Sequence, residues 1–380
     1  MTDWLRHLVT AGGLGGGVVA ALAGAVLAQI LVWGMGRLEE PPARRRGVRA
    51  GLVSALGGAA AVGLWWWEIR LRAQVPGAGP TPDAELIMRC GAHLVLFTLL
   101  AAAASIDLRH RVIPDGITVT GVILGLAWMT LLPEALLPVV METPRSFAAP
   151  AQTPDVLGLA GPLRTPAWPT WLEDRPSWTG LLLACGAFTA WWSVGTAAAD
   201  AATDGADRAS ALLQPRPAIA TVGIVGIVLA WSVGGDHWRA AASGLVGLAV
   251  AGGIVWLTRI GGSLALGREA LGFGDVTLMA MVGAWLGWQP AVLTCFLGVL
   301  IGLVHGLVQL LVHRDRELPF GPSLCLAAAA VVVWWRPLWQ RAGPLFQRPT
   351  ELLAVVMAVI LLTAVSLWVW QELRRARASA

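Results

Sequence analysis

The chain has 380 residues, of which 56% are apolar and only 13% are charged, whereas soluble globular domains carry about 25% charged residues. It contains no Lys, no Tyr and no Asn, so all 27 basic residues are Arg. This composition argues against a soluble protein, and the lack of Lys excludes a Walker-type phosphate loop, a Schiff-base mechanism and a Ser–Lys dyad.

Apolar stretches of about 18 or more residues are candidate membrane spans, and roughly eleven segments come near that length. We expect an all-α fold, a polytopic transmembrane helical bundle of roughly eleven spans. The eighth and tenth segments are short for a span. In chain order the segments are 10–35, 49–67, 90–107, 116–133, 178–199, 217–233, 240–258, 276–288, 291–312, 321–335 and 351–371.

The placement of arginine predicts the orientation, because cytoplasmic loops near span ends carry an excess of positive charge. The loop after the first segment holds five arginines between residues 37 and 49, so we place that loop inside. Alternation then puts the N-terminus outside and the C-terminus inside, with most arginines on the inner side. The loop at 134–177, rich in Pro and Trp, falls outside, where its tryptophans are expected to lie at the headgroup level.

No metal site is predicted. The four cysteines are far apart in sequence and lie in or beside apolar runs, so we interpret them as small buried side chains. His93 and His305 lie in apolar segments and are expected to be packed or hydrogen-bonded histidines. Cys90 precedes His93 by one helical turn, but two ligands fall short of the three or four that zinc needs.

Two acidic residues each lie against an apolar segment instead of inside a polar loop. Asp107 closes the third segment in the stretch Ser105-Ile106-Asp107, and Asp275 opens the eighth in Gly272-Phe273-Gly274-Asp275. A carboxylate at a membrane boundary is costly if it is pushed toward the bilayer centre, so its retention points to a function. The alternation scheme places both aspartates on the cytoplasmic side, where they could meet.

Paired carboxylates are the apparatus of an aspartic hydrolase. The charge of one keeps the other protonated, and the ionised one activates a water that attacks a peptide carbonyl. The neutral partner donates a proton to the developing oxyanion or to the leaving amine. The glycines before Asp275 let an extended substrate approach the carboxylate closely, although they could also only cap a helix or let helices pack.

These segments resemble the type IV prepilin peptidases, membrane aspartic proteases of the GxGD class. The stretch from Ser105 to Asp115, with its Ile-Pro-Asp end, is similar to the family's first catalytic segment. The family's second catalytic segment is matched by Glu269, by Gly272-Phe273-Gly274-Asp275 and by the Gly-Ala-Trp-Leu-Gly-Trp stretch at 283–288. A third match is Leu318-Pro319-Phe320-Gly321-Pro322.

The resemblance implies a role for each matching position. Asp107 and Asp275 would be the catalytic residues, and Gly272 and Gly274 would shape the active-site loop. Glu269 and Asp115 are candidates for supporting groups around the pair. The chemistry implied requires no cofactor and no metal.

This sequence also departs from the family pattern. Many bacterial members have two CxxC pairs associated with N-methylation, and this sequence has none, so methyltransferase activity is not expected. Thr277 stands where the family often has Lys. Roughly four of the expected spans separate the aspartates instead of two.

We therefore expect residues 1–88 to form an N-terminal membrane region without a counterpart in the family, and residues 89–335 to form a peptidase domain. A helix pair and the Trp/Pro loop would be inserted within about 134–235, and 336–380 would form a last span and basic tail.

The resemblance implies an endopeptidase of the bacterial cytoplasmic (inner) membrane that removes basic leaders from type IV prepilins or pseudopilins. Its partners would be such a substrate, with a basic leader and a hydrophobic helix, and membrane lipid, with no nucleic acid. Two alternatives remain open. One is a cation or proton transporter or channel that uses intramembrane carboxylates, which would predict internal repeats. The other is a family paralogue with a changed substrate.

Overall fold

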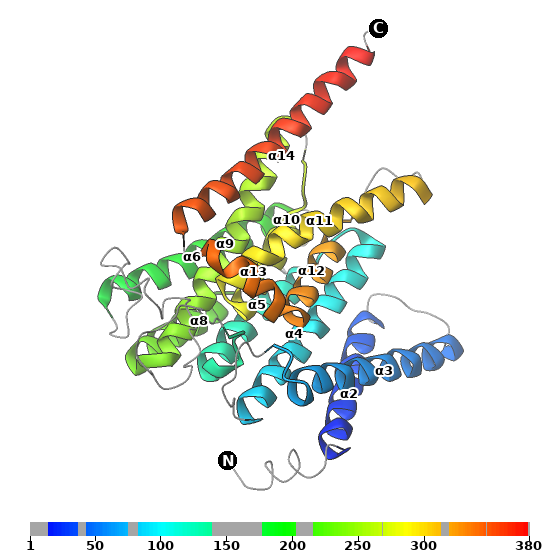
Figure 1. Ribbon diagram of the computed structural model, residues 1–380, viewed down its shortest axis with the longest axis vertical. Coiled ribbons are helices and arrows are strands. Elements are labelled where there is room, and N and C mark those ends of the chain that lie inside the picture. The colour runs from blue at the N-terminus through cyan, green and yellow to red at the C-terminus, as the bar shows by residue number, and fades with distance from the viewer. Residues whose placement is uncertain are drawn as a thin grey trace.

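The protein is described by a computed structural model that covers residues 14–36, 43–74, 83–138, 177–202, 216–267, 269–312, 319–346 and 348–378. Every regular element within these ranges is a helix, which confirms the all-α prediction (Figure 1). The described α-helices are α2 (Leu14–Gly36), α3 (Ala43–Trp65), α4 (Asp83–His110), α5 (Asp115–Leu131), α6 (Trp178–Ala202), α8 (Arg216–Val233), α9 (Gly235–Leu266), α10 (Phe273–Leu286), α11 (Trp288–Val312), α12 (Gly321–Val333), α13 (Trp335–Phe346) and α14 (Pro349–Ala378).

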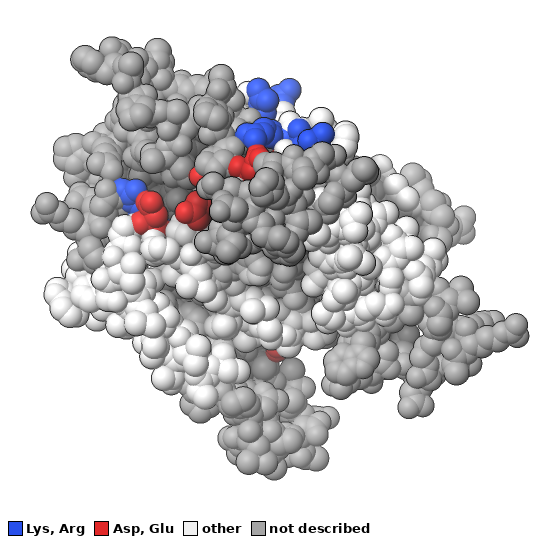
Figure 2. All heavy atoms as spheres, turned by 90° about the horizontal axis from the view of Figure 1, so that it is seen from below, with Lys and Arg blue, Asp and Glu red and all other residues white. Residues whose placement is uncertain are grey.

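Within the described ranges, each apolar segment expected from the sequence overlaps a helix. By length and composition, 4 helices among the described residues could cross a membrane, or up to 5 if α12 and α13 together form one span. Further apolar helices of 10–17 residues, α5 and α10 among them, lie between these. Figure 2 shows one face on which the described charged side chains gather mainly in one region, while most of the described surface around it is uncharged. The molecule is a polytopic helical membrane protein.

Helix α10 forms the centre of the bundle. All its residues from Asp275 to Leu286 are buried, and α9, α5, α11 and α12 pack around it. Gly247 of α9 and Gly283 of α10 meet backbone to backbone, with no room for a side chain on either. Small residues are what allow helices in membranes to approach this closely.

Two smaller helical groups flank this core on opposite sides in Figure 1. Helices α2 and α3 pack on each other and share a small apolar cluster with α4. Helices α6 and α8 pack together against α9 around the buried side chains of Phe188 and Trp238. The α6–α8 group falls in the segment that we predict to be inserted, and most of the Trp/Pro loop, residues 139–176, lies outside the described residues.

The tenth expected segment, 321–335, differs from a simple span. Helix α12 has 13 residues, fewer than the roughly 20 that cross a bilayer. After Trp334 the chain bends by 95° into α13. Pro337 has no backbone N–H and cannot continue the hydrogen-bond ladder of α12, which accounts for the break at this point. Helix α13 corresponds to none of the segments that the sequence predicts.

Candidate active site

Asp107 lies in the last turn of α4, where the helix ends in a left-handed residue. The Arg111 backbone has φ 56°, and its N–H donates to the Asp107 carbonyl at 2.8 Å. A residue in this conformation is a common way to end a helix and redirect the chain. The turn leads into α5, and the Asp107 side chain is 5% exposed.

Asp275 lies in the first turn of α10, and Gly272 precedes that helix as its N-cap. The Gly272 backbone N–H donates a hydrogen bond to the Asp275 carboxylate. The side chain is 7% exposed and lies close enough to Asp107 for the two carboxyl groups to interact electrostatically. The structure therefore brings together the two aspartates that the sequence singled out.

The third motif meets the same pair. Gly321, the first residue of α12, donates its backbone N–H to the Asp107 carboxylate. A methyl group on Gly321 would lie 2.5 Å from the Asp107 Oδ2 atom and 2.9 Å from the Ile113 Cδ1 atom. On Gly274 it would lie 2.9 Å from the Ile113 Cβ atom. A side chain at either position would have to displace Ile113 or, at Gly321, also the Asp107 carboxylate.

The two predicted supporting groups lie farther out. Asp115 is exposed in the first turn of α5. The Glu269 side chain is 61% exposed and forms an ion pair with Arg259 of α9. Arg259 also donates from Nε to the Leu271 carbonyl at 3.0 Å, and its guanidinium lies over the Phe273 ring. Glu269 therefore pairs with Arg259, and Arg259 in turn holds the loop before α10 through Leu271 and Phe273.

Sequence reasoning missed Arg259 and Cys325. The signal for Arg259 was a charged residue inside the apolar end of α9. Cys325, one helical turn after Gly321, is buried and lies close enough to both carboxylates to interact with their charge. A lone cysteine in an apolar run carries no sequence signal of that kind.

Thr277, at the position where the family often has Lys, is buried. Its hydroxyl donates to the Gly274 carbonyl at 3.1 Å within the same turn of α10. The side chain thus stabilises the first turn of α10, which carries Asp275.

The predictions for the two apolar histidines are confirmed. His93 Nδ1 lies 2.7 Å from Glu68 Oε1, and His305 Nδ1 lies 3.3 Å from Ser323 Oγ. Within the described ranges no three side chains of His, Cys, Asp and Glu gather as metal ligands would.

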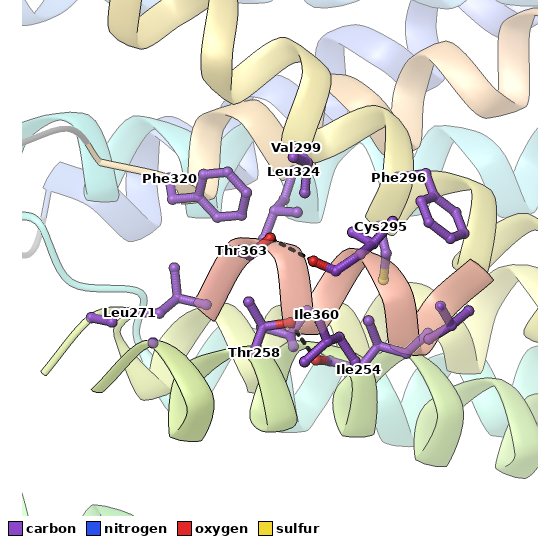
Figure 3. Close-up of a pocket in the computed structure, with 15 residues that line it drawn as sticks. Ile254, Thr258, Leu271, Cys295, Phe296, Val299, Phe320, Leu324, Ile360 and Thr363 are labelled. Atoms are coloured by element: carbon purple, nitrogen blue, oxygen red, sulfur yellow. Dashed lines mark hydrogen bonds between the residues drawn. The ribbon is translucent and has the colours of Figure 1, made fainter. Parts of the chain in front are cut away.

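An apolar pocket of about 230 Å³ opens beside the motif loops, between α9, α11, α12 and α14 (Figure 3). Leu271, just before the GxGD stretch, and Phe320, just before α12, both line it. Thr258 and Thr363 also line it, but each hydroxyl donates to a carbonyl of its own helix at 2.8 Å. The pocket therefore offers apolar surface to whatever occupies it.

Fold and site together define a polytopic α-helical membrane protein with two buried, interacting carboxyl groups at the ends of its helices. Such a pair can share a proton, hold a water and move protons to and from a substrate in a site screened from bulk solvent.

Residues 207–307 match the model of the type IV leader peptidase family. The chain is similar to curated proteins named prepilin leader peptidase/N-methyltransferase. The protein from Aeromonas salmonicida (strain A449) is 34% identical over 84 residues, 21% of this chain and 29% of the relative. The protein from Stutzerimonas stutzeri is 37% identical over 93 residues, which are 24% of this chain and 31% of the relative. The protein from Dickeya chrysanthemi is 42% identical over 89 residues, which are 22% of this chain and 31% of the relative. No solved structure matches the chain.

The resemblance to the prepilin peptidases is thereby confirmed, over a limited part of the chain. The matched stretches span less than a third of these relatives. The family match contains Asp275 but neither Asp107 nor the Pro-Phe-Gly-Pro stretch. The pairing of Asp107 with Asp275 therefore rests on the structure.

Proposed function

We propose that this protein is a membrane aspartic endopeptidase that cleaves basic leader peptides from type IV prepilins or pseudopilins. The observation that carries the proposal is the meeting of Asp107 and Asp275, both buried and in electrostatic contact, in a chain that resembles the leader peptidases. The proposal covers peptide cleavage and not methyl transfer.

In the proposed reaction the ionised carboxylate of the pair takes a proton from a water, and the hydroxide attacks the carbonyl carbon of the scissile bond. The protonated partner then gives its proton to the amide nitrogen, and the C–N bond of the tetrahedral intermediate breaks. Gly321 and Gly272 keep the two carboxyl groups oriented through their backbone N–H groups. Burial of the pair strengthens each electrostatic interaction, because the local dielectric is low.

We assign this end of the molecule to the cytoplasmic side of the bacterial inner membrane. Arg109 and Arg111 are exposed beside Asp107, and positive charge next to spans favours the cytoplasmic side. A prepilin could then keep its hydrophobic helix in the lipid while its basic leader reaches the site from the cytoplasm.

The apolar pocket beside the site supports a substrate of this kind. Its lining continues from Leu271 and Phe320 of the motif loops to α14, so an apolar segment in the pocket would lie next to the carboxylates. Catalytic sites that act on one bond of a long substrate commonly bind remote parts of it to orient that bond.

The proposal is tested by co-expressing the protein with a prepilin and following the leader's removal by gel shift. Asp107→Asn and Asp275→Asn should each leave the precursor uncleaved, while Asp236→Asn should cleave like the wild type. Asp236 is a matched control because it also lies in the first turn of a helix, α9, but is exposed and paired with Arg239. Cleavage by either site variant at the wild-type level would contradict the proposal.

A further inference from the structure

The C-terminal end of α12 leaves two carbonyl groups, those of the buried Val332 and the half-buried Val333, without their usual helical donors. The ladder partner of the Val333 carbonyl would be the N–H of Pro337, which proline lacks. The 95° bend after α12 interrupts the ladder for Val332 as well. Such groups must be satisfied within the protein where lipid surrounds it.

Two side chains from the N-terminal region supply the missing donors. The Trp67 indole Nε1 donates to the Val333 carbonyl at 2.8 Å, and the Gln74 Nε2 donates to the Val332 carbonyl at 2.7 Å. Trp67 lies on a π-helical turn, η1 (Trp66–Arg70), at the end of α3. Turns of this kind are rare and are often found at functional positions.

A buried polar network holds Gln74 in this position. Its Nε2 atom also donates to Glu68 Oε1 at 2.9 Å, and His93 Nδ1 lies 2.7 Å from the same oxygen. All three side chains are about 1% exposed. Arg89, equally buried, interacts with the Glu68 charge and donates to the carbonyls of Leu136 and Glu134. Four buried polar side chains are costly in a membrane protein and call for a role.

The other end of α12 reaches the active site, where Gly321 donates its N–H to the Asp107 carboxylate. Helix α12 is a single stretch of 13 residues, so a shift at Val332 or Val333 moves Gly321 with it. We propose that Trp67 and Gln74 are positioning residues, which fix the end of α12 so that Gly321 stays in register with Asp107. The N-terminal region, without a counterpart in the family resemblance, thereby acts as an internal brace for the site.

The first test does not depend on the proposed function. Hydrogen–deuterium exchange of residues 319–324 is measured by mass spectrometry for the whole protein in nanodiscs. Trp67→Phe and Gln74→Met each remove a hydrogen-bond donor and leave an apolar side chain of roughly similar size in its place. Each should raise the exchange rate of this segment roughly tenfold, because the loss of one buried hydrogen bond is enough for such a change.

Trp231→Phe is the matched control. Its indole also donates to a carbonyl, that of Ser177 at 3.0 Å, but within the α6–α8 group. It should leave exchange at 319–324 at the wild-type rate. Exchange at the wild-type rate in both brace variants would overturn the proposal, and so would equal acceleration in the control. If one brace variant fails to fold, exchange at the wild-type rate in the other is enough to overturn it.

The second test rests on the proposed function. With a prepilin substrate, each brace variant should lower kcat roughly tenfold with KM nearly unchanged, since misplaced groups at a site cost rate more than binding. Unchanged kcat together with accelerated exchange would overturn the positioning role. A wild type that cleaves no prepilin would instead contradict the proposed function, and the exchange result would still decide the brace.

Discussion

Gly321 donates its backbone N–H to the carboxylate of Asp107, and a side chain on Gly321 would lie 2.5 Å from that carboxylate. Two segments far apart in the sequence thus fit against each other with no space to spare. The Pro-Phe-Gly-Pro stretch therefore has a physical explanation here: it starts α12 with an N–H donor directed at the first aspartate.

Gly321→Ala should accordingly impair catalysis more than folding. The added methyl group must displace Asp107 or Ile113, and we expect kcat to fall roughly 100-fold and stability to fall by about 1–3 kcal/mol. The measurements are prepilin cleavage and thermal unfolding in one detergent. Gly253→Ala is the matched control, because nothing lies within 4 Å of that methyl position in α9. Equal activity of the two variants would refute the assigned fit.

Thr277→Val should lower kcat several-fold while Thr277→Ser stays near the wild type. The Thr277 hydroxyl donates to the Gly274 carbonyl, and losing such a bond costs about 0.5–1.5 kcal/mol. The measurement is the initial rate of leader cleavage at saturating prepilin. If Val and Ser variants behave alike, the hydroxyl does not support the turn that carries Asp275.

Arg259→Met should reduce activity much more than Glu269→Gln. Arg259 holds the loop before α10 through the Leu271 carbonyl and the Phe273 ring, whereas an exposed ion pair such as that with Glu269 contributes only about 0–1 kcal/mol. Cleavage rates of the two variants give the comparison. A larger loss in Glu269→Gln would return Glu269 to the role of a direct supporting group.

Filling the apolar pocket should affect only substrates with a hydrophobic helix. Val299→Trp places a large ring among the lining residues and should raise KM for a whole prepilin roughly tenfold, with little change for a short leader peptide. Val222→Trp, in a second apolar pocket between α5, α8 and α9, is the control. Equal effects on both substrates would mean that the pocket does not bind the apolar helix.

Much of the fold could be predicted from the sequence, because the expected segments are apolar and each overlaps a helix in the described part of the chain. The bend after α12 could not. Pro337 interrupts the hydrogen-bond ladder there, but the carbonyls that it leaves are bonded by Trp67 and Gln74, and only the folded chain brings these together.

The site shows the same division. Asp107, Asp275 and the glycines before Asp275 have local motifs and could be recognised. Arg259 stands out in the sequence only as a charge in an apolar helix, and the contacts through which it and Glu68 act lie elsewhere in the fold, so no local pattern identifies their partners. The sequence predicts a packed or hydrogen-bonded His93, but it does not identify Glu68 as the partner.

The central claim is that Asp107 and Asp275 work as one unit, and a double-variant comparison tests it most directly. Purified wild type, Asp107→Asn, Asp275→Asn and the double variant are assayed in nanodiscs on a whole prepilin, and mass spectrometry locates the cut. Groups that act together are strongly non-additive. We predict that each single variant loses as much activity as the double variant. Substantial leader cleavage by either single variant, or losses that add up in the double variant, would contradict a shared catalytic pair.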